Sequence, residues 1–288
     1  MRDNHEIVLN LATYEFPWDT LQALSFALFR TYAVPSIGGL LDRTGEFTTR
    51  VQKRYDDTGL LLEEVLEHGL ASPRGRTAVR RVNQMHAMYD ISADDMRYVL
   101  ATFVVIPKRW LDSYGYRPMT EVEAAAATNY YRELGAHLGI KELPADFAAF
   151  ERLLDDYERS HFGYDEGGRR VADSTLRLMT TFPPNNLAPA RLVKRLAYSL
   201  MEDHLLDAFG YPRPGRLERA LFTGALRLRG RLLRMAPARR TPKWARDFGY
   251  FRSYPNGFDV YGLGTFSSGA GCPVRPGSRP VDPVRVVS

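Results

Sequence analysis

Three residues in the first third of the chain have types and spacing that can do chemistry. Arg54 and Thr58 are four residues apart, so on a helix their side chains lie on one face, one turn apart. His86 belongs to the next predicted helix, on the same apolar side as Val79 and Val82. A guanidinium, a hydroxyl and an imidazole on adjoining helices are typical either of an ordinary packed core or of one wall of a haem pocket.

His86 has two readings. A lone histidine on an apolar helix face is more often a hydrogen-bonded core residue than a ligand. As a haem ligand it would need a neutral ring nitrogen that points into an apolar cavity, with its other nitrogen held by an acceptor. Met85 and Tyr89, its neighbours in sequence, would then supply soft packing against the macrocycle.

Arg54 and Thr58 also have two readings. At the surface, Arg54 would form an ion pair with Asp56 or Asp57, and Thr58 would bond its own backbone. Facing inward, Arg54 would need a carboxylate or a haem propionate, because an unpaired buried guanidinium is very costly.

Other histidines allow weaker alternatives. Glu158-x-x-His161 is half of the pattern of a di-iron carboxylate bundle, which needs two such motifs and two further glutamates on facing helices. Only one such motif is present. His137, four residues after Glu133, is either an alternative haem ligand or a packed residue at a helix end.

Helices must position these residues, because almost no stretch shows the strict alternation of a strand. Ser72-Pro73 is an N-cap followed by proline at the first helical position, and Thr120 with Glu123 forms a capping box. Ser92 with Asp95 forms a second box of this kind. The predicted helices are 5–13, 18–32, 54–69, 72–89, 92–110, 121–138, 144–160, 169–181, 189–209 and 216–235, and 37–41 is a short apolar segment.

Composition sets the class of protein. The 288 residues are 44% hydrophobic and 25% charged, which is normal for a globular protein. Cys272 is the single cysteine, so the chain has no intramolecular disulfide framework and no cysteine metal site. We predict one all-α domain of about eight to ten helices over residues 1–265, and a disordered Gly/Pro/Arg-rich tail over residues 266–288.

Apolar runs and the distribution of charge indicate where the protein is located and what it binds. No signal peptide or membrane-length apolar run is visible, so we expect a cytoplasmic protein. In 216–235, leucines line one side and arginines another. This segment is either a core-packing helix with a solvated basic face or an interfacial helix that holds the protein on anionic lipid. The net charge of +5 is modest and no recognised module is present, so we expect no nucleic-acid partner. The sequence does not fix an oligomeric state.

Ordered motifs around these residues resemble a known family. The segments in question are Arg54-Tyr-Asp-Asp-Thr58, Asn83-Gln-Met-His86, Tyr89-Asp-Ile-Ser-Ala-Asp-Asp95 and Tyr254-Pro-Asn-Gly-Phe258. In this order they resemble the MpaB/rubber-oxygenase family, which includes the latex-clearing proteins, and more closely its MpaB branch. The likeness spans roughly residues 8–264.

The resemblance implies a single all-α bundle of the rubber-oxygenase type that encloses an apolar pocket for haem b. It implies His86 as the iron ligand, Arg54 and Thr58 as catalytic residues beside the haem, and Met85 and Tyr89 as further cofactor contacts. The implied reaction is an O₂-dependent oxidation of a hydrophobic, isoprenoid or prenylated small molecule.

Two departures from the family pattern are visible. Asp57 stands where the rubber oxygenases have a lysine, and no position matches their distal glutamate. The alternative is therefore a cofactor-free helical lipid-binding or membrane-peripheral scaffold protein of the same fold.

Overall fold

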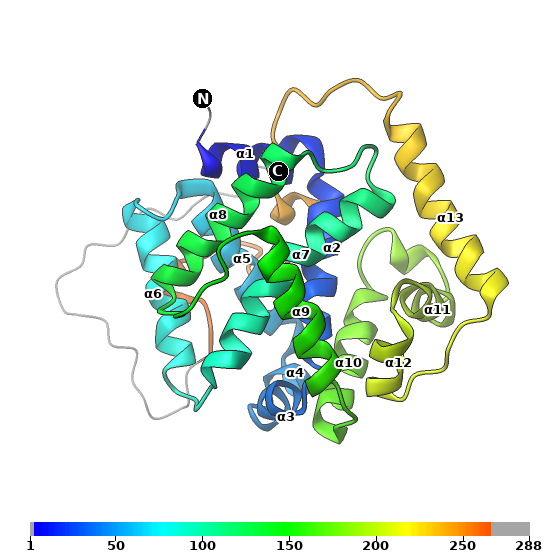
Figure 1. The fold of residues 1–288 in the computed structure, drawn as a ribbon, viewed down its shortest axis with the longest axis horizontal. Coiled ribbons are helices and arrows are strands. Elements are labelled where there is room, and N and C mark those ends of the chain that lie inside the picture. Colours follow the sequence, from blue (N-terminus) through cyan, green and yellow to red (C-terminus); the bar gives the residue numbers. More distant parts are fainter. Residues whose placement is uncertain (1–2, 266–288) are drawn as a thin grey trace.

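The computed structural model describes residues 3–265, and this part of the chain is an assembly of helices without strands (Figure 1). The predicted all-α class is confirmed. The predicted tail, 266–288, lies outside the described residues. The α-helices are α1 (Asn4–Asn10), α2 (Pro17–Thr31), α3 (Pro35–Arg43), α4 (Glu46–Thr49), α5 (Val51–His68), α6 (Pro73–His86), α7 (Ala93–Tyr114), α8 (Glu121–His137), α9 (Phe147–His161), α10 (Glu166–Met179), α11 (Ala190–Leu200), α12 (Asp203–Phe209) and α13 (Arg216–Leu233). Short 3₁₀ turns are η2 (Asn185–Leu187), η3 (Ala245–Phe248) and η4 (Val260–Gly262), and one π-helical turn, η1, spans Leu11–Glu15.

The helix count within residues 3–265 is higher than the eight to ten predicted. One reason is that the predicted helix 189–209 is two helices, α11 and α12. Between them Met201 is extended and packs into a buried apolar cluster. Glu202 accepts a hydrogen bond from Arg30 at 2.6 Å. These tertiary contacts outweigh the helical propensity of the segment.

The centre of the molecule is α7. Every residue from Leu100 to Pro107 is buried, so this helix is covered on all sides, as expected for a core helix. α2, α9 and α13 pack against it. The Ser92 hydroxyl caps its first turn by accepting from the amide of Asp95 at 2.9 Å.

A tight antiparallel pair, α5 and α6, carries the predicted site residues. Gly69 ends α5 with φ 77°, and Ser72 caps α6 by accepting from the amide of Gly75 at 2.9 Å. Leu61 and Val65 of α5 pack in one buried cluster with Val79 and neighbouring residues. This pair lies at the opposite end of the molecule from α13 (Figure 1).

A C-terminal strap, which we define as residues 243–264, crosses α5 and α6. Phe251 packs directly on Gly59 of α5. The carbonyl oxygen of Leu263 accepts from Arg81 of α6 at 2.7 Å. The strap therefore ties the two helices of the pair together.

Among residues 3–265, no single helix combines the length and apolar character of a membrane span. Taken together, the bent pair α2 and α3, at 95°, meets that length and composition criterion.

Candidate functional site

Arg54 and Thr58 lie together on one face of α5. Arg54 Nη1 donates a hydrogen bond to Thr58 Oγ1. The hydroxyl of Thr58 donates in turn to the carbonyl oxygen of Arg54 at 3.1 Å. The guanidinium lies over the ring of Phe47, 5.2 Å from its centroid. Within residues 3–265, no carboxylate lies at ion-pair distance from Arg54.

The two neighbouring aspartates are not partners of Arg54. Asp57 is buried and accepts from Lys53 Nζ at 2.6 Å and from the hydroxyl of Tyr254. Asp56 is fully buried and accepts the backbone amides of Arg252 and Ser253 at 3.0 and 2.8 Å. Both acids therefore fasten the strap to α5, and the surface ion pair considered from the sequence is absent.

His86 is the last residue of α6 and is largely withdrawn from water. Burial is the main cause that lowers its pKa to about 4, and the positive charge of Arg54 lowers it further. The imidazole is thus neutral near pH 7. Its Nδ1 atom is buried and has no hydrogen-bond partner among the described residues. A neutral ring with an unengaged buried nitrogen has the donor chemistry of a haem ligand. The acceptor expected for the other nitrogen is not present among these residues.

Met85 and Tyr89 flank His86 but point to different surroundings. Met85 packs against Gly264 of the strap and belongs to the apolar cluster between α5 and α6. Tyr89 follows α6 in a turn, where its amide donates to the carbonyl oxygen of His86 at 3.1 Å. Its side chain is 38% exposed.

The two residues of the di-iron pattern, Glu158 and His161, do not form a shared metal site. Glu158 is buried and accepts from Arg30 Nε at 2.8 Å, and its other oxygen contacts His204 at 3.1 Å. His161 stacks on Tyr157, with ring centroids 3.9 Å apart. The carboxylate of Glu158 is therefore already paired, and His161 does not join it. His137 is exposed at the end of α8.

One group of potential metal ligands occurs within residues 3–265, formed by Glu64, Glu67 and His68. Glu64 accepts two hydrogen bonds from Arg74, both at 2.8 Å. Glu67 accepts two from Arg246, at 2.7 and 3.0 Å. Since arginines already satisfy both carboxylates, we do not assign an ion to this group.

Two residues near Arg54 were missed by sequence reasoning. Tyr32 is buried, which raises its pKa to about 12, while the nearby charge of Arg54 acts in the opposite direction. Glu46 precedes Phe47 and is also buried. One of its oxygens pairs with Arg50, but Oε2 has no partner among the described residues. Following the turn at Gly45, Glu46 looks like an exposed acid in a helix's first turn, so no sequence signal marks it as buried.

Two cavities are described here within residues 3–265. The larger, about 580 Å³, lies between α9 and α12 and is lined by Phe162, Tyr164 and His204, among others. The smaller is a narrow cavity of about 70 Å³ between α2, α10 and α11, with Tyr55 and Leu226 in its walls. Neither is lined by His86, Arg54 or Thr58.

Fold and site together define an all-α protein in which two helices meet at a neutral histidine whose Nδ1 has no partner, and at an arginine without a carboxylate partner, among residues 3–265. The profile of the family described as "ER-bound oxygenase mpaB/B'/Rubber oxygenase, catalytic domain" matches residues 20–235. The chain belongs to this family, and the family predicted from its motifs is confirmed.

Curated relatives point the same way. The chain is 32% identical over 248 residues to the "ER-bound oxygenase mpaB'" of Penicillium brevicompactum, a match that covers 80% of this chain and 58% of the relative. It is 30% identical over 224 residues to the "ER-bound oxygenase mpaB" of Penicillium roqueforti, with 72% and 74% covered. The chain thus spans little more than half the length of the first of these relatives, 58%.

Proposed function

We propose that this protein is a haem-b-dependent oxygenase that acts with O₂ on a hydrophobic, isoprenoid or prenylated small molecule. The observation that carries the proposal is the buried Nδ1 of His86, which has no partner among the described residues and belongs to a ring with a pKa of about 4. The family description, an oxygenase catalytic domain, supports the reaction class.

His86 would hold the haem iron, because a neutral imidazole offers a lone pair without prior loss of a proton. When bound, the haem supplies the O₂ chemistry of the reaction. Arg54, which has no carboxylate partner among the described residues, fits the negative charge of a propionate. Thr58 fixes the direction of the guanidinium by accepting its hydrogen bond. Met85 and Tyr89 would contact the cofactor from either side of His86.

The hydrophobic substrate class and a membrane-peripheral location form part of the same proposal. Both relatives are named as ER-bound. The helix α13, within the predicted segment 216–235, carries exposed leucines and three arginines that pair with none of the described residues, as expected of an interfacial helix.

The visible absorption spectrum of the purified protein tests the haem proposal. We expect a Soret band that is lost in His86→Ala and retained in the matched control His137→Ala, whose histidine is exposed at the end of α8. Circular dichroism of each variant checks that the helices are intact. Protein that stays colourless after haem reconstitution, or a His86→Ala variant that keeps the band, would overturn the proposal.

A cofactor-free lipid-binding protein of the same fold is the second candidate. It is favoured by the position of both described cavities away from His86 and by the missing acceptor for its ring. This candidate predicts no Soret band under any condition, together with binding of lipid vesicles.

A further inference from the structure

Four leucines of α13 face solvent instead of the core. Leu217 and Leu221 are 85% and 67% exposed, and Leu228 and Leu232 are 54% and 55% exposed. Helical spacing places these four residues in one stripe along the helix. A Cβ added at Gly224, between them, would meet no atom within 4 Å. The apolar side of this helix is therefore open along its length.

The opposite side of α13 is firmly attached to the protein. Gly230 is buried against the backbone carbonyls of Tyr114 and Gly115 at the end of α7. The guanidinium of Arg229 lies 4.0 Å from the ring centroid of Trp18 and donates to Asp19 at 2.9 Å. These contacts fix the rotation of the helix, so the outward direction of the leucines is a property of the fold. The four leucines that the core-packing reading of 216–235 would bury are therefore exposed, although the other side of the helix does pack on α7.

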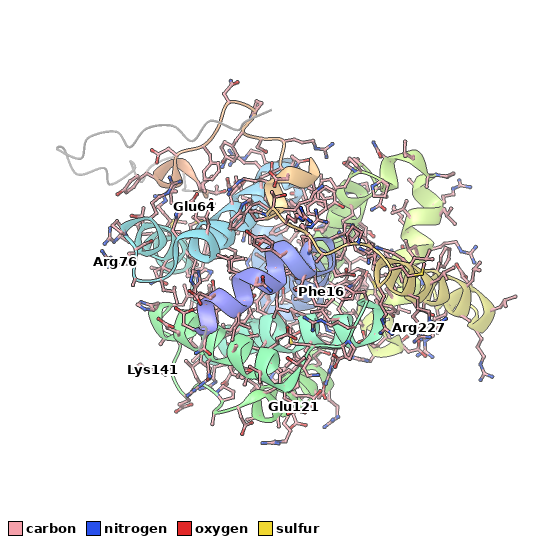
Figure 2. All side chains as sticks on the ribbon, turned by 90° about the horizontal axis from the view of Figure 1, so that it is seen from above. Phe16, Glu64, Arg76, Glu121, Lys141 and Arg227 are labelled. Carbon is pink, nitrogen blue, oxygen red and sulfur yellow. The ribbon has the colours of Figure 1, made fainter. Side chains whose placement is uncertain are left out.

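Unpaired cations lie beside the leucine stripe. Arg216, Arg227 and Arg231 are exposed and form no side-chain hydrogen bond or ion pair with the described residues. Figure 2 shows Arg227 at the outer surface, at the far end of the molecule from Arg76. The single acid within α13, Glu218, is held by Arg195 at 2.5 Å. The face thus combines apolar side chains with positive charge that no residue of the described part of the chain neutralises.

We propose that this face of α13 docks onto a membrane surface that contains anionic lipids. Leucines in a stripe can enter the boundary between headgroups and acyl chains, while flanking arginines bind lipid phosphates. Charge argues against a second copy of the chain as the occupant, because two such faces would bring arginines of like sign together. The surface that matches this face has negatively charged headgroups above an apolar layer, as an anionic membrane does.

Docking at α13 would also bring the membrane close to the narrow cavity. Leu226, on the inner side of α13, lines the narrow cavity, and Tyr55 lines it too. Tyr55 is the residue next to Arg54 on α5, and its hydroxyl lies 3.3 Å from Ser25 Oγ. A role of this cavity in access of a hydrophobic substrate rests on the proposed function. Docking itself needs no haem.

Vesicle sedimentation of the full chain tests the electrostatic part of the proposal. We expect binding to phosphatidylcholine vesicles that contain phosphatidylserine, little binding to pure phosphatidylcholine, and weaker binding as salt is raised. Combined Arg216→Gln, Arg227→Gln and Arg231→Gln substitutions should weaken binding by roughly a hundredfold, about fivefold for each cation. The matched control carries Arg80→Gln, Arg152→Gln and Arg177→Gln, which remove three exposed arginines from other helices.

The apolar part is tested with Leu221→Glu and Leu228→Glu, against the control Leu187→Glu. Leu187 lies outside α13 and is 85% exposed, more than either of the two leucines tested. Binding should be lost in the first two and kept in the control and in His86→Ala.

Failure of the wild type to bind anionic vesicles, or equal losses in variants and controls, would overturn docking. A leucine variant that changes only the oligomeric state would show that another copy covers this face. Wild-type protein without a Soret band that still binds anionic vesicles would overturn the haem proposal and support docking.

Discussion

Arg54 donates a hydrogen bond to the hydroxyl of Thr58, one turn further along α5, and that hydroxyl donates back to the carbonyl oxygen of Arg54. The guanidinium is therefore oriented by a neutral partner and keeps its full charge for another group. In a haem protein that group would be a propionate.

Haem affinity should therefore fall strongly when Arg54 is replaced and less when Thr58 is replaced. Arg54→Gln removes the cation and should weaken haem binding by roughly ten- to a hundredfold, in line with a charged hydrogen bond of about 1.5–3 kcal/mol. Thr58→Val keeps the shape but not the hydroxyl, and should weaken binding by a few fold. Absorbance titration of haem into the haem-free variants measures both. Unchanged affinity in Arg54→Gln would show that Arg54 does not contact the cofactor.

The pH dependence of the haem-free protein should reveal the burial of His86. Its pKa is about 4 in the native state, mainly because of burial, against about 6.5 when unfolded. Between these values the unfolded state binds the proton and the native state does not. Stability is therefore lost as the pH falls through this window, by up to about 3 kcal/mol. Thermal unfolding of His86→Asn should show a flatter profile than wild type, whereas the exposed control His137→Asn should not differ from wild type.

The sequence predicted the helices well where local signals and tertiary contacts agree. Thr120 and Glu123 form the full reciprocal capping box expected of them. Ser92 caps α7 as predicted, but the side chain of Asp95 accepts from Ser36 and Tyr157 instead of completing a box. Such long-range partners cannot be read from a local motif.

The candidate site shows the same limit. Four-residue spacing placed Arg54 and Thr58 on one face, but only the fold shows that no described carboxylate reaches Arg54. Asp57 looked like a surface acid beside Arg54, yet it is buried and bonded to Tyr254, 197 residues away. The strap that creates this burial is Gly- and aromatic-rich and has no helical periodicity that would predict where it packs.

Asp57 should therefore act as a structural residue. Asp57→Lys, which installs the amino acid of the rubber oxygenases, would bury a cation beside Lys53 and remove the acceptor of Tyr254. We expect a loss of about 3–5 kcal/mol in the free energy of unfolding, as for a broken buried ion pair. Tyr254→Phe, which deletes one hydrogen bond, should cost about 1 kcal/mol. Urea unfolding compares the two. A stable Asp57→Lys protein would contradict this assignment.

Arg30 and Glu158 should behave as a second structural pair. Both are buried, and Arg30 donates from Nε to Glu158 at 2.8 Å. Arg30→Met would leave the Glu158 carboxylate without its main partner and should destabilise the protein by about 3–5 kcal/mol. Added Fe²⁺ should not restore the stability of this variant, since His161 does not join the carboxylate. Recovery of stability with Fe²⁺ would revive the di-iron reading.

Glu63 should impose a pH dependence opposite to that of His86. Burial raises its pKa to about 7, although Arg246 and the amide of Ala245 oppose the shift. Between its unfolded pKa of about 4.3 and this value the native state binds the extra proton. Stability therefore falls as the pH rises through the window, and the cost is complete above about pH 7, at up to about 3 kcal/mol.

Glu63→Gln tests this directly, because glutamine keeps an oxygen acceptor for the amide of Ala245, which lies 2.7 Å from the carboxylate. The variant should match wild type at about pH 4, below the unfolded pKa, and be more stable near pH 8, as measured by thermal unfolding. Glu67→Gln is the control, since it removes a carboxylate that also pairs with Arg246 but is more exposed. If both variants follow the wild-type profile, the strap's attachment to α5 does not depend on the protonation of Glu63.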